Sequence, residues 1–310
     1  YSYLLTENTG ENYAGKAYAV ESFGSVLGGV AVNFIFLWFF GTFAALKVLL
    51  LINFCVVFLC LFSLQGKLVR IIYSLFILLL VILVYYPNLT EFTQKLLFSG
   101  QHVILDRSTP YGTVVITENA GQLTVFENGL PLFSSHNEIF DEDAVHYPMV
   151  QHPRPENVLL ISGRISGTIN EIKKYNPRRI DYVELNPALV EIGKTFPGSL
   201  KDPVVHVYNE DGRRFLNNHH EKYDVVLVLL PGPSAIQINR FYTLEYFRIL
   251  KDHLSANAIV SMSLPPTSDY VSKTAAELNS SLFNTLKREF RNVLIIPGQK
   301  GQQVRKVHVA

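Results

Sequence analysis

The sequence is poor in cysteine and has no long run of basic residues. Only two of its 310 residues are Cys, and 27 Lys and Arg stand against 26 Asp and Glu, for a net charge of +1. Cys55 and Cys60 are five residues apart in an apolar stretch, so on a helix their side chains point in different directions. We therefore expect neither a disulfide nor a metal site. Without a basic run, nucleic-acid binding has no electrostatic support.

The first hundred residues are dominated by long apolar stretches. Three of them, at 18–40, 43–64 and 68–86, have about the 20 residues that a helix needs to cross a bilayer. Their short connections predict an up-down-up bundle. We expect residues 1–100 to form a multi-pass transmembrane region of about three helices with a linker, and the lipid bilayer to be its partner. The second connection carries Lys67 and Arg70, and the first is followed by Lys47. Because this difference is a single positive charge, the side of the membrane on which the soluble part lies stays undetermined.

The first apolar stretch carries small and ionisable residues. Gly24 and Gly28 form a small-xxx-small pattern, which lets helices approach closely in lipid, although scattered glycines in a tolerant helix would look the same. Glu21 is a functional candidate or a group that reaches the interface. Asn33 and Asn53 are interpreted as contacts between helices. Because the chain begins at Tyr1 without a basic n-region, we expect a processed or truncated protein rather than one that starts with a signal peptide.

The rest of the chain changes from strand-like to alternating patterns. Segments 113–117 and 122–126 flank a turn-like tetrapeptide, which predicts a hairpin within a small β subdomain at 101–140. From 141 to 310, apolar strands alternate with helical stretches, which predicts a doubly wound, mainly parallel, Rossmann-like α/β sheet. The strands are expected at 157–161, 180–184, 204–208, 225–229, 259–263 and 293–296, and the helices at 167–174, 187–194, 213–218, 243–253 and 269–289.

Glycines and acids follow the first three strands of this domain. Ligands of such sheets bind outside the carboxyl ends of the strands. Gly163 and Gly167 would let the backbone approach a nucleotide, Glu184 would accept bonds from a ribose, and Asp211 beside Gly212 would reach an adenine. Taken alone, a tight turn explains the two glycines about as well, a helix cap explains Asp211 about as well, and a surface carboxylate at a strand end explains Glu184 better. Together the positions favour an adenosine-containing ligand of the S-adenosylmethionine kind.

The order of these motifs resembles the spermidine synthase (polyamine aminopropyltransferase) family, and more narrowly a divergent member of its membrane-bound branch. The resemblance implies a Rossmann-like, methyltransferase-like domain that binds decarboxylated S-adenosylmethionine or methylthioadenosine. It also implies transfer of an aminopropyl group to putrescine. The segments that carry it are 15–29, 111–112, 127–129, 141–148, 182–187, 211–215 and 239–243.

The sequence departs from the family where the chemistry is expected. The resemblance implies an acid at the end of the fourth strand, which serves as the base, and a second acid three residues later. Here those positions hold Leu229 and Gly232. Further departures are Arg164, Ile165 and Ser166 in the glycine-rich turn, Asn186 in place of an acid, and Gly112 in place of a Gln.

Three hypotheses follow from these observations. The first is a catalytically silent, membrane-anchored structural or regulatory subunit, in a homo-oligomer or a membrane protein complex. The second is an active transferase with a substitute base, for which His146 and Tyr147 are better candidates than Glu210 or Asp224. The third is a transport protein with a nucleoside-sensing domain, supported only by Glu21.

Overall fold

The structure of the protein is a computed structural model in which the chain forms two compact units. One unit comprises residues 1–103 with 108–112, and the other comprises 104–107 with 113–310. Each is described by itself. The structure describes residues 13–36, 42–61, 66–85, 89–135, 138–163, 167–195, 200–230, 232–233, 235–264, 272–296 and 306–309.

The first unit is helical. The predicted apolar stretches fold as α2 (Tyr13–Ala31), which continues as the π-helical η1 (Val32–Phe36), α4 (Thr42–Leu61) and α5 (Lys67–Tyr85), and the predicted linker contains a further helix, α6 (Leu89–Leu97). Within the described residues, one helix, Gly15–Ile35, is long and apolar enough to cross a membrane. The apolar helices Ala44–Val57 and Ile71–Ile82 are shorter. The expectation of three spans therefore stays a prediction.

The polar and small residues of these helices do not join helices to one another in the contacts that the structure describes. The side-chain amide of Asn33 donates to the Gly29 carbonyl, and that of Asn53 donates to the Leu49 carbonyl, each at 2.8 Å. Both bonds lie within one helix, so the predicted interhelical role is not seen. The space beside Gly24 and Gly28 is open to at least 4 Å.

The second unit begins with an antiparallel β subdomain. Its strands are β1 (His102–Thr109), β2 (Gly112–Asn119), β3 (Gln122–Glu127) and β4 (Leu130–Ser134), in the spatial order of the sequence. The predicted hairpin is formed, with Ile116 opposite Val125. Its turn has positive φ at Ala120 (50°) and Gly121 (80°), and the next turn repeats this at Asn128 and Gly129. Two such residues in a row give a twist that matches paired strands.

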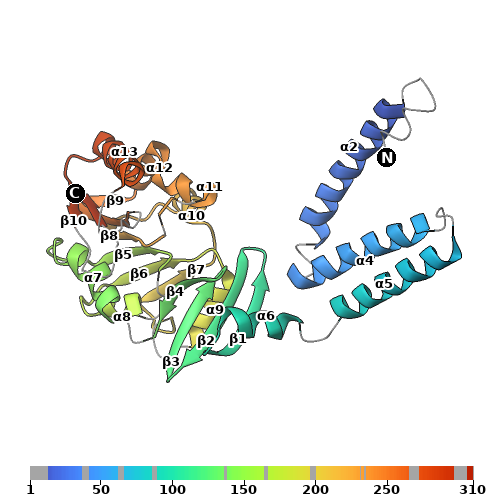
Figure 1. The fold of residues 1–310 in the computed structure, drawn as a ribbon. Helices are drawn as coiled ribbons and strands as arrows, with labels where there is room; N and C mark the ends of the chain where they lie inside the picture. The colour runs from blue at the N-terminus through green and yellow to red at the C-terminus, as the bar shows by residue number, and fades with distance from the viewer. Residues whose placement is uncertain are drawn as a thin grey trace. The chain divides into compact units, whose positions relative to one another are not determined.

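A seven-stranded sheet follows, and it confirms the predicted Rossmann-like architecture (Figure 1). The spatial order is β10-β11-β9-β8-β5-β6-β7. The five strands from β9 to β7 are parallel, and β11 runs antiparallel to both of its neighbours. The strands are β5 (Asn157–Ile161), β6 (Arg179–Val183), β7 (Val205–Tyr208), β8 (Tyr223–Val228), β9 (Leu254–Ser263), β10 (Val293–Ile296) and β11 (Lys306–Val309).

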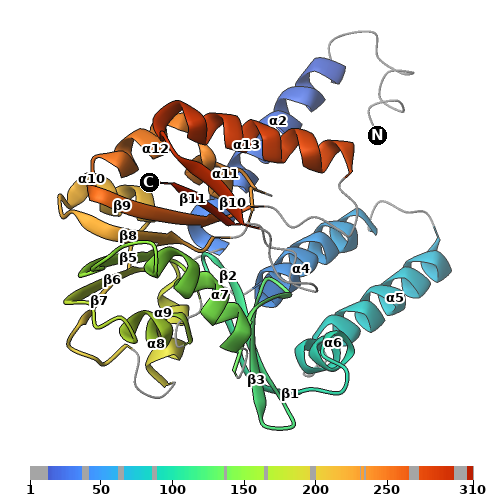
Figure 2. The same cartoon turned by 90° about the vertical axis from the view of Figure 1, so that its left-hand side faces the viewer.

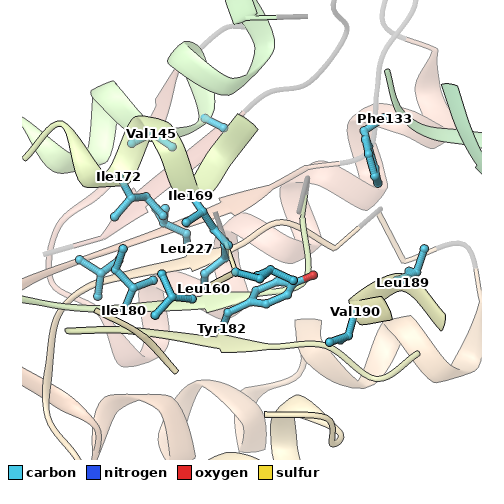
Figure 3. Close-up of a cluster of buried hydrophobic side chains, with 14 of the residues drawn as sticks. Phe133, Val145, Leu160, Ile169, Ile172, Ile180, Tyr182, Leu189, Val190 and Leu227 are labelled. Atoms are coloured by element: carbon cyan, nitrogen blue, oxygen red, sulfur yellow. The ribbon is translucent and has the colours of Figure 1, made fainter. Parts of the chain in front are cut away.

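Helices cover both faces of this sheet, as Figure 2 shows. Successive strand residues point to opposite faces. Leu160 and Leu227 pack with Ile169 and Ile172 on one face (Figure 3), while Leu159 packs on the other. The first face is covered by α7 (Glu138–Met149), α8 (Gly167–Lys173) and α9 (Pro187–Thr195), and the second by α10 (Gly212–Asn218), α12 (Leu244–Lys251) and α13 (Lys273–Glu289). The short helices α11 (Ile236–Asn239) and η2 (Arg240–Tyr242) precede α12.

A single carboxylate ties three strands together at the amino edge of the sheet. Asp224, near the start of β8, accepts hydrogen bonds from the backbone amides of Glu156 (3.0 Å) and Asn157 (2.9 Å) and from the Ser255 hydroxyl (2.7 Å). These partners lie at β5 and β9. Asp224 therefore lies at the opposite end of β8 from the strand-to-helix turns, and its hydrogen bonds hold the sheet together.

Candidate functional site

The strand order reverses between β5 and β8, and this switch point is where a doubly wound sheet binds its ligands. From β5 the chain proceeds to β6 and β7 on one side, while β8 and β9 lie on the other. The residues at this switch point are Ser162 and Gly163 after β5 and Leu229 after β8. The Leu229 amide donates to the Ile161 carbonyl at 3.0 Å, which continues the pairing of the two strands by one residue.

Leu229 lies against the glycine turn at this point. Gly163 has a φ of +117°, a conformation that favours glycine, and a Cβ there would lie 3.1 Å from Cδ1 and 3.3 Å from Cβ of Leu229. Leu229 also packs on the hydrophobic core. The turn thus meets an apolar side chain at the position where the resemblance implies an acid. Gly232 is half-buried beyond the strand, and residues 164–166, the other predicted departures in the turn, lie outside the described residues.

Gly167 has a packing role at the start of α8. A Cβ at this position would overlap the carboxylate of Asp141, which is buried and accepts a hydrogen bond from the Thr168 hydroxyl at 2.9 Å. The missing side chain lets α7 approach the first turn of α8. The sequence assigned Gly167 to ligand binding and gave Asp141 no role, because the contact joins segments that are far apart in the chain.

Glu184 follows β6, is only 5% exposed, and has internal partners for both carboxylate oxygens. Oε1 accepts from the Asn186 amide (3.0 Å), and Oε2 accepts from the hydroxyls of Ser162 (3.2 Å) and Tyr182 (3.4 Å). Burial raises the pKa of Glu184, and the nearby charge of Glu127 raises it further. The three hydrogen bonds lower it, but the net shift is upward. The side chain predicted to bind a ribose is therefore part of a buried polar network.

Asn186 connects this network to the β subdomain. Its side-chain oxygen accepts from the Ala188 amide at 3.1 Å, in the first turn of α9, and its side-chain nitrogen donates to Glu127 at 2.9 Å. An aspartate at the same position would have no donor for Glu127. The departure from the family pattern thus has a structural explanation within this chain. Segment 127–129 carries part of the family resemblance, but no local pattern signals the pairing of Glu127 with Asn186.

Asp211 caps α10 and forms an ion pair. Its Oδ1 accepts from the backbone amides of Arg213 (3.1 Å) and Arg214 (3.2 Å), which is one of the two roles that the sequence left open. Its Oδ2 pairs with the guanidinium of Arg240, 29 residues later. Gly212 is required next to it because a Cβ there would lie 2.9 Å from Cγ2 of Ile161.

The candidate substitute bases have other partners or are exposed. His146 contacts the carboxylate of Glu171 in the last turn of α8 (Nε2, 3.0 Å) and the hydroxyl of Tyr175 just after that helix (Nδ1, 2.7 Å), whereas Gly167 begins the helix. Tyr147 is 44% exposed. Glu210 lies 3.3 Å from His219. The structure therefore brings Gly163 and Leu229 together and holds His146 toward the opposite end of α8.

Comparison with known proteins identifies the domain. The family model of the spermine/spermidine synthase domain matches residues 137–267. A polyamine aminopropyltransferase of Oceanobacillus iheyensis is 28% identical over 245 residues, which cover 74% of this chain and 48% of that protein. One of Streptococcus uberis is 35% identical over 170 residues, which cover 52% of this chain and 57% of that protein. The matched part of the chain thus spans about half the length of these relatives.

Solved structures agree in fold. Spermidine synthase in complex with the transition-state analogue AdoDATO superposes with a TM-score of 0.59 at 18% identity, covering 67% of this chain and 73% of that one. Spermidine synthase from Thermotoga maritima gives 0.57 at 17% identity, covering 67% and 72%. At this identity the likeness shows the fold, an antiparallel β subdomain followed by a Rossmann-like parallel sheet. Residues 137–267 thus match a spermine/spermidine synthase domain, and the chain is similar in sequence to polyamine aminopropyltransferases and in fold to spermidine synthase.

Proposed function

We propose that this protein is a catalytically silent spermidine synthase-like subunit, anchored to a membrane, with a structural or regulatory role. The observation that carries the proposal is the packing of Leu229 against Gly163 at the switch point. The family resemblance implies a carboxylate there, which takes a proton from the attacking amine. A leucine can neither accept a proton nor stabilise an ammonium, and loss of a general base alone slows a reaction by about 10²–10⁴-fold.

The groups that would hold a nucleoside are already engaged, which supports the same proposal. Asp211 is bound by two backbone amides and Arg240, and both oxygens of Glu184 face internal donors. A ligand such as methylthioadenosine or decarboxylated S-adenosylmethionine would have to replace these partners. We therefore expect weak binding at most, with a role in sensing rather than in turnover.

The alternative of an active transferase with His146 as base gains no support from the geometry. Both ring nitrogens of His146 face partners, Glu171 in the last turn of α8 and Tyr175 just after it. Tyr147 uses its carbonyl to accept a bond from Gln151 at 2.7 Å, and its half-exposed ring lies on the same helix, α7. The further alternative of a transport protein is likewise supported by no contact of Glu21 that the structure describes.

The decisive assay is aminopropyl transfer. Purified full-length chain is incubated with decarboxylated S-adenosylmethionine and putrescine, and release of methylthioadenosine is measured. We expect none above background, and turnover that disappears in His146→Ala would overturn the proposal. A Leu229→Asp, Gly232→Asp double variant should show measurable turnover, while the matched Leu229→Asn, Gly232→Asn variant, with similar shape and no base, should not.

Nucleoside binding is tested separately by calorimetry with methylthioadenosine. Removal of the Arg240 guanidinium frees Oδ2 of Asp211, so Arg240→Ala should bind the nucleoside more tightly than the unsubstituted chain. Glu184→Ala should abolish the gain. Equal heats in all three proteins, indistinguishable from buffer, would remove the sensing role and leave a purely structural subunit.

The membrane part of the proposal rests on α2, α4 and α5. Their apolar side chains are exposed over the described residues, and the match to the Oceanobacillus protein covers more of the chain than residues 101–310 contain. We propose that these helices span the bilayer, as a multi-pass anchor that also contacts a second copy or another membrane subunit. The full chain should stay in the membrane fraction after carbonate extraction, and its release would contradict the anchor.

A further inference from the structure

Two neighbouring helices bring three potential metal ligands together. Glu142 and His146 are four residues apart on α7, which places them on one face of the helix, and Glu171 faces them from α8. One ligand atom of each lies within 4.8 Å of the other two. Among the residues that the structure describes, this is the only such group of three or more His, Cys, Asp or Glu. We call it the α7–α8 cluster.

The spacing within the cluster matches metal coordination. Zinc binds nitrogen and oxygen at about 2.0–2.2 Å, so two ligand atoms separated by angles of about 90–110° lie roughly 3–3.5 Å apart. The Nε2 of His146 lies 3.0 Å from Oε2 of Glu171. On the other side of the ring, Nδ1 contacts the Tyr175 hydroxyl at 2.7 Å. A partner of this kind on the second nitrogen is typical of metal-binding histidines, because it fixes the ring and leaves Nε2 free to coordinate.

Glu171 is unusual for a surface helix residue. It is only 8% exposed, and its buried Oε2 has no hydrogen-bond donor among the described residues. His146 Nε2 and Lys174 Nζ lie close enough for ion pairing, at 3.0 and 2.6 Å, but neither contact is directed as a hydrogen bond. A buried carboxylate oxygen without a directed donor is costly. A bound cation would satisfy it.

The charges around the cluster leave room for a divalent ion. Three carboxylates, those of Glu171, Glu142 and Glu138, surround the single ammonium of Lys174. Three negative charges therefore face one ammonium. The Lys174 side chain is 54% exposed, so its end can turn into solvent. Its place beside Glu171 can then be taken by a metal ion.

We propose that the α7–α8 cluster binds a divalent transition metal of the Zn²⁺ class, with Glu142, His146 and Glu171 as ligands. Tyr175 orients the imidazole, and water completes the coordination, as in zinc sites with three protein ligands. The ion replaces Lys174 and joins α7 to α8. This inference does not rest on the proposed function, since the ligands lie away from Leu229. It also revises the expectation from sequence that the chain holds no metal.

The test is zinc titration of the full chain after removal of metal with a chelator, followed by calorimetry and by the visible absorption of bound Co²⁺. We expect one saturable site per chain. Glu142→Gln, at an exposed position where the fold tolerates change, should weaken Zn²⁺ binding at least about tenfold, and His146→Ala should abolish the Co²⁺ absorption. The matched control is His219→Ala, which removes a histidine of similar exposure that lies 3.3 Å from Glu210. It should change neither measurement.

The competing ammonium supplies a second, independent measurement. Lys174→Ala removes the group that the metal has to displace, so Zn²⁺ should bind more tightly than in the unsubstituted chain, by several-fold. An ion pair of a protonated His146 with Glu171, without a metal site, predicts no saturable zinc binding. Absence of that binding, unchanged affinity in Glu142→Gln, or weaker affinity in Lys174→Ala would each overturn the proposal.

Discussion

The α/β unit buries its apolar side chains, whereas the helical unit exposes many of its own. In the α/β unit, Leu160 is fully buried between the sheet and α8. In the helical unit, Leu75 is 60% exposed and Leu27 is 54% exposed. Exposed apolar patches of this kind mark surfaces that contact a partner or a membrane. The same residue type therefore has a different energetic role in each unit, which substitutions can measure.

The largest expected effect is the loss of a core leucine. Leu160→Ala should lower the free energy of unfolding of the α/β unit by about 2–5 kcal/mol, because it leaves a cavity beneath α8. Leu75→Ala, at an exposed position, should change stability by about 0.5 kcal/mol or less. Urea-induced unfolding of the full chain, with hydrogen exchange at the β5 amides as a local readout, separates the two. A similar loss of stability in both variants would contradict the predicted difference between buried and exposed leucines.

The next comparison is between Gly167, at the start of α8, and Gly24, in α2. Gly167→Ala forces a Cβ into the Asp141 carboxylate and should destabilise the α/β unit by about 1–3 kcal/mol. Gly24→Ala, beside open space in α2, should be neutral or stabilise its helix by up to about 1 kcal/mol. Thermal unfolding of both full-length variants tests the pair. If Gly24→Ala were the more harmful substitution, a close helix–helix contact at Gly24 would be indicated.

The cap of α10 should have a smaller effect. Asp211→Ala removes the acceptor of two backbone amides and should lower stability by about 0.5–2 kcal/mol. Arg240→Ala breaks only a partly exposed ion pair and should lower it by about 1 kcal/mol or less. Equilibrium unfolding in urea measures both. Equal losses would mean that the ion pair, rather than the cap, is the main role of Asp211.

The smallest effect is a change in pH dependence. The pKa of buried Glu184 is raised, so the folded chain binds this proton more tightly than the unfolded chain. Its contribution to stability is fully present below the ordinary value of 4.5 and is lost as the pH rises through the raised pKa. Glu184→Gln can keep the hydrogen bond from the Asn186 amide but does not titrate. The variant should therefore lose less unfolding free energy as the pH rises, with a difference of about 1 kcal/mol or less. Melting temperatures from pH 4 to 8 provide the measurement, and a steeper decline would contradict it.

The fold of the α/β unit was predictable because its strands are short, apolar and separated by clear turn residues. Strand β5 was predicted with its observed bounds, while β8 ends at Val228, one residue before the predicted end. The helix α7 was missed as an element, since Pro148 near its end and its mixed polar sequence hide the helical period. Local patterns identify apolar strands better than helices that pack partly through charges.

The candidate site was predictable in position but not in its contacts. Gly163 and Leu229 were placed at one edge of the sheet, and the structure brings them into contact. The pair of Asp211 with Arg240 joins residues 29 apart in sequence, and no local pattern signals it. For the α7–α8 cluster, a signal was present in the four-residue spacing of Glu142 and His146. Their partner Glu171 is supplied only by the folded helix pair.

The carboxylate of Asp224 has a consequence for the order of folding. Its hydrogen-bond partners are Ser255, 31 residues later, and the amides of Asn157 and Glu156, 67 and 68 residues earlier. These bonds can form only after two long loops have closed, and the entropy of closure is lost before the contact contributes anything. The amino edge of the sheet should therefore assemble in one late, cooperative step, and removal of this carboxylate should speed unfolding more than it slows folding.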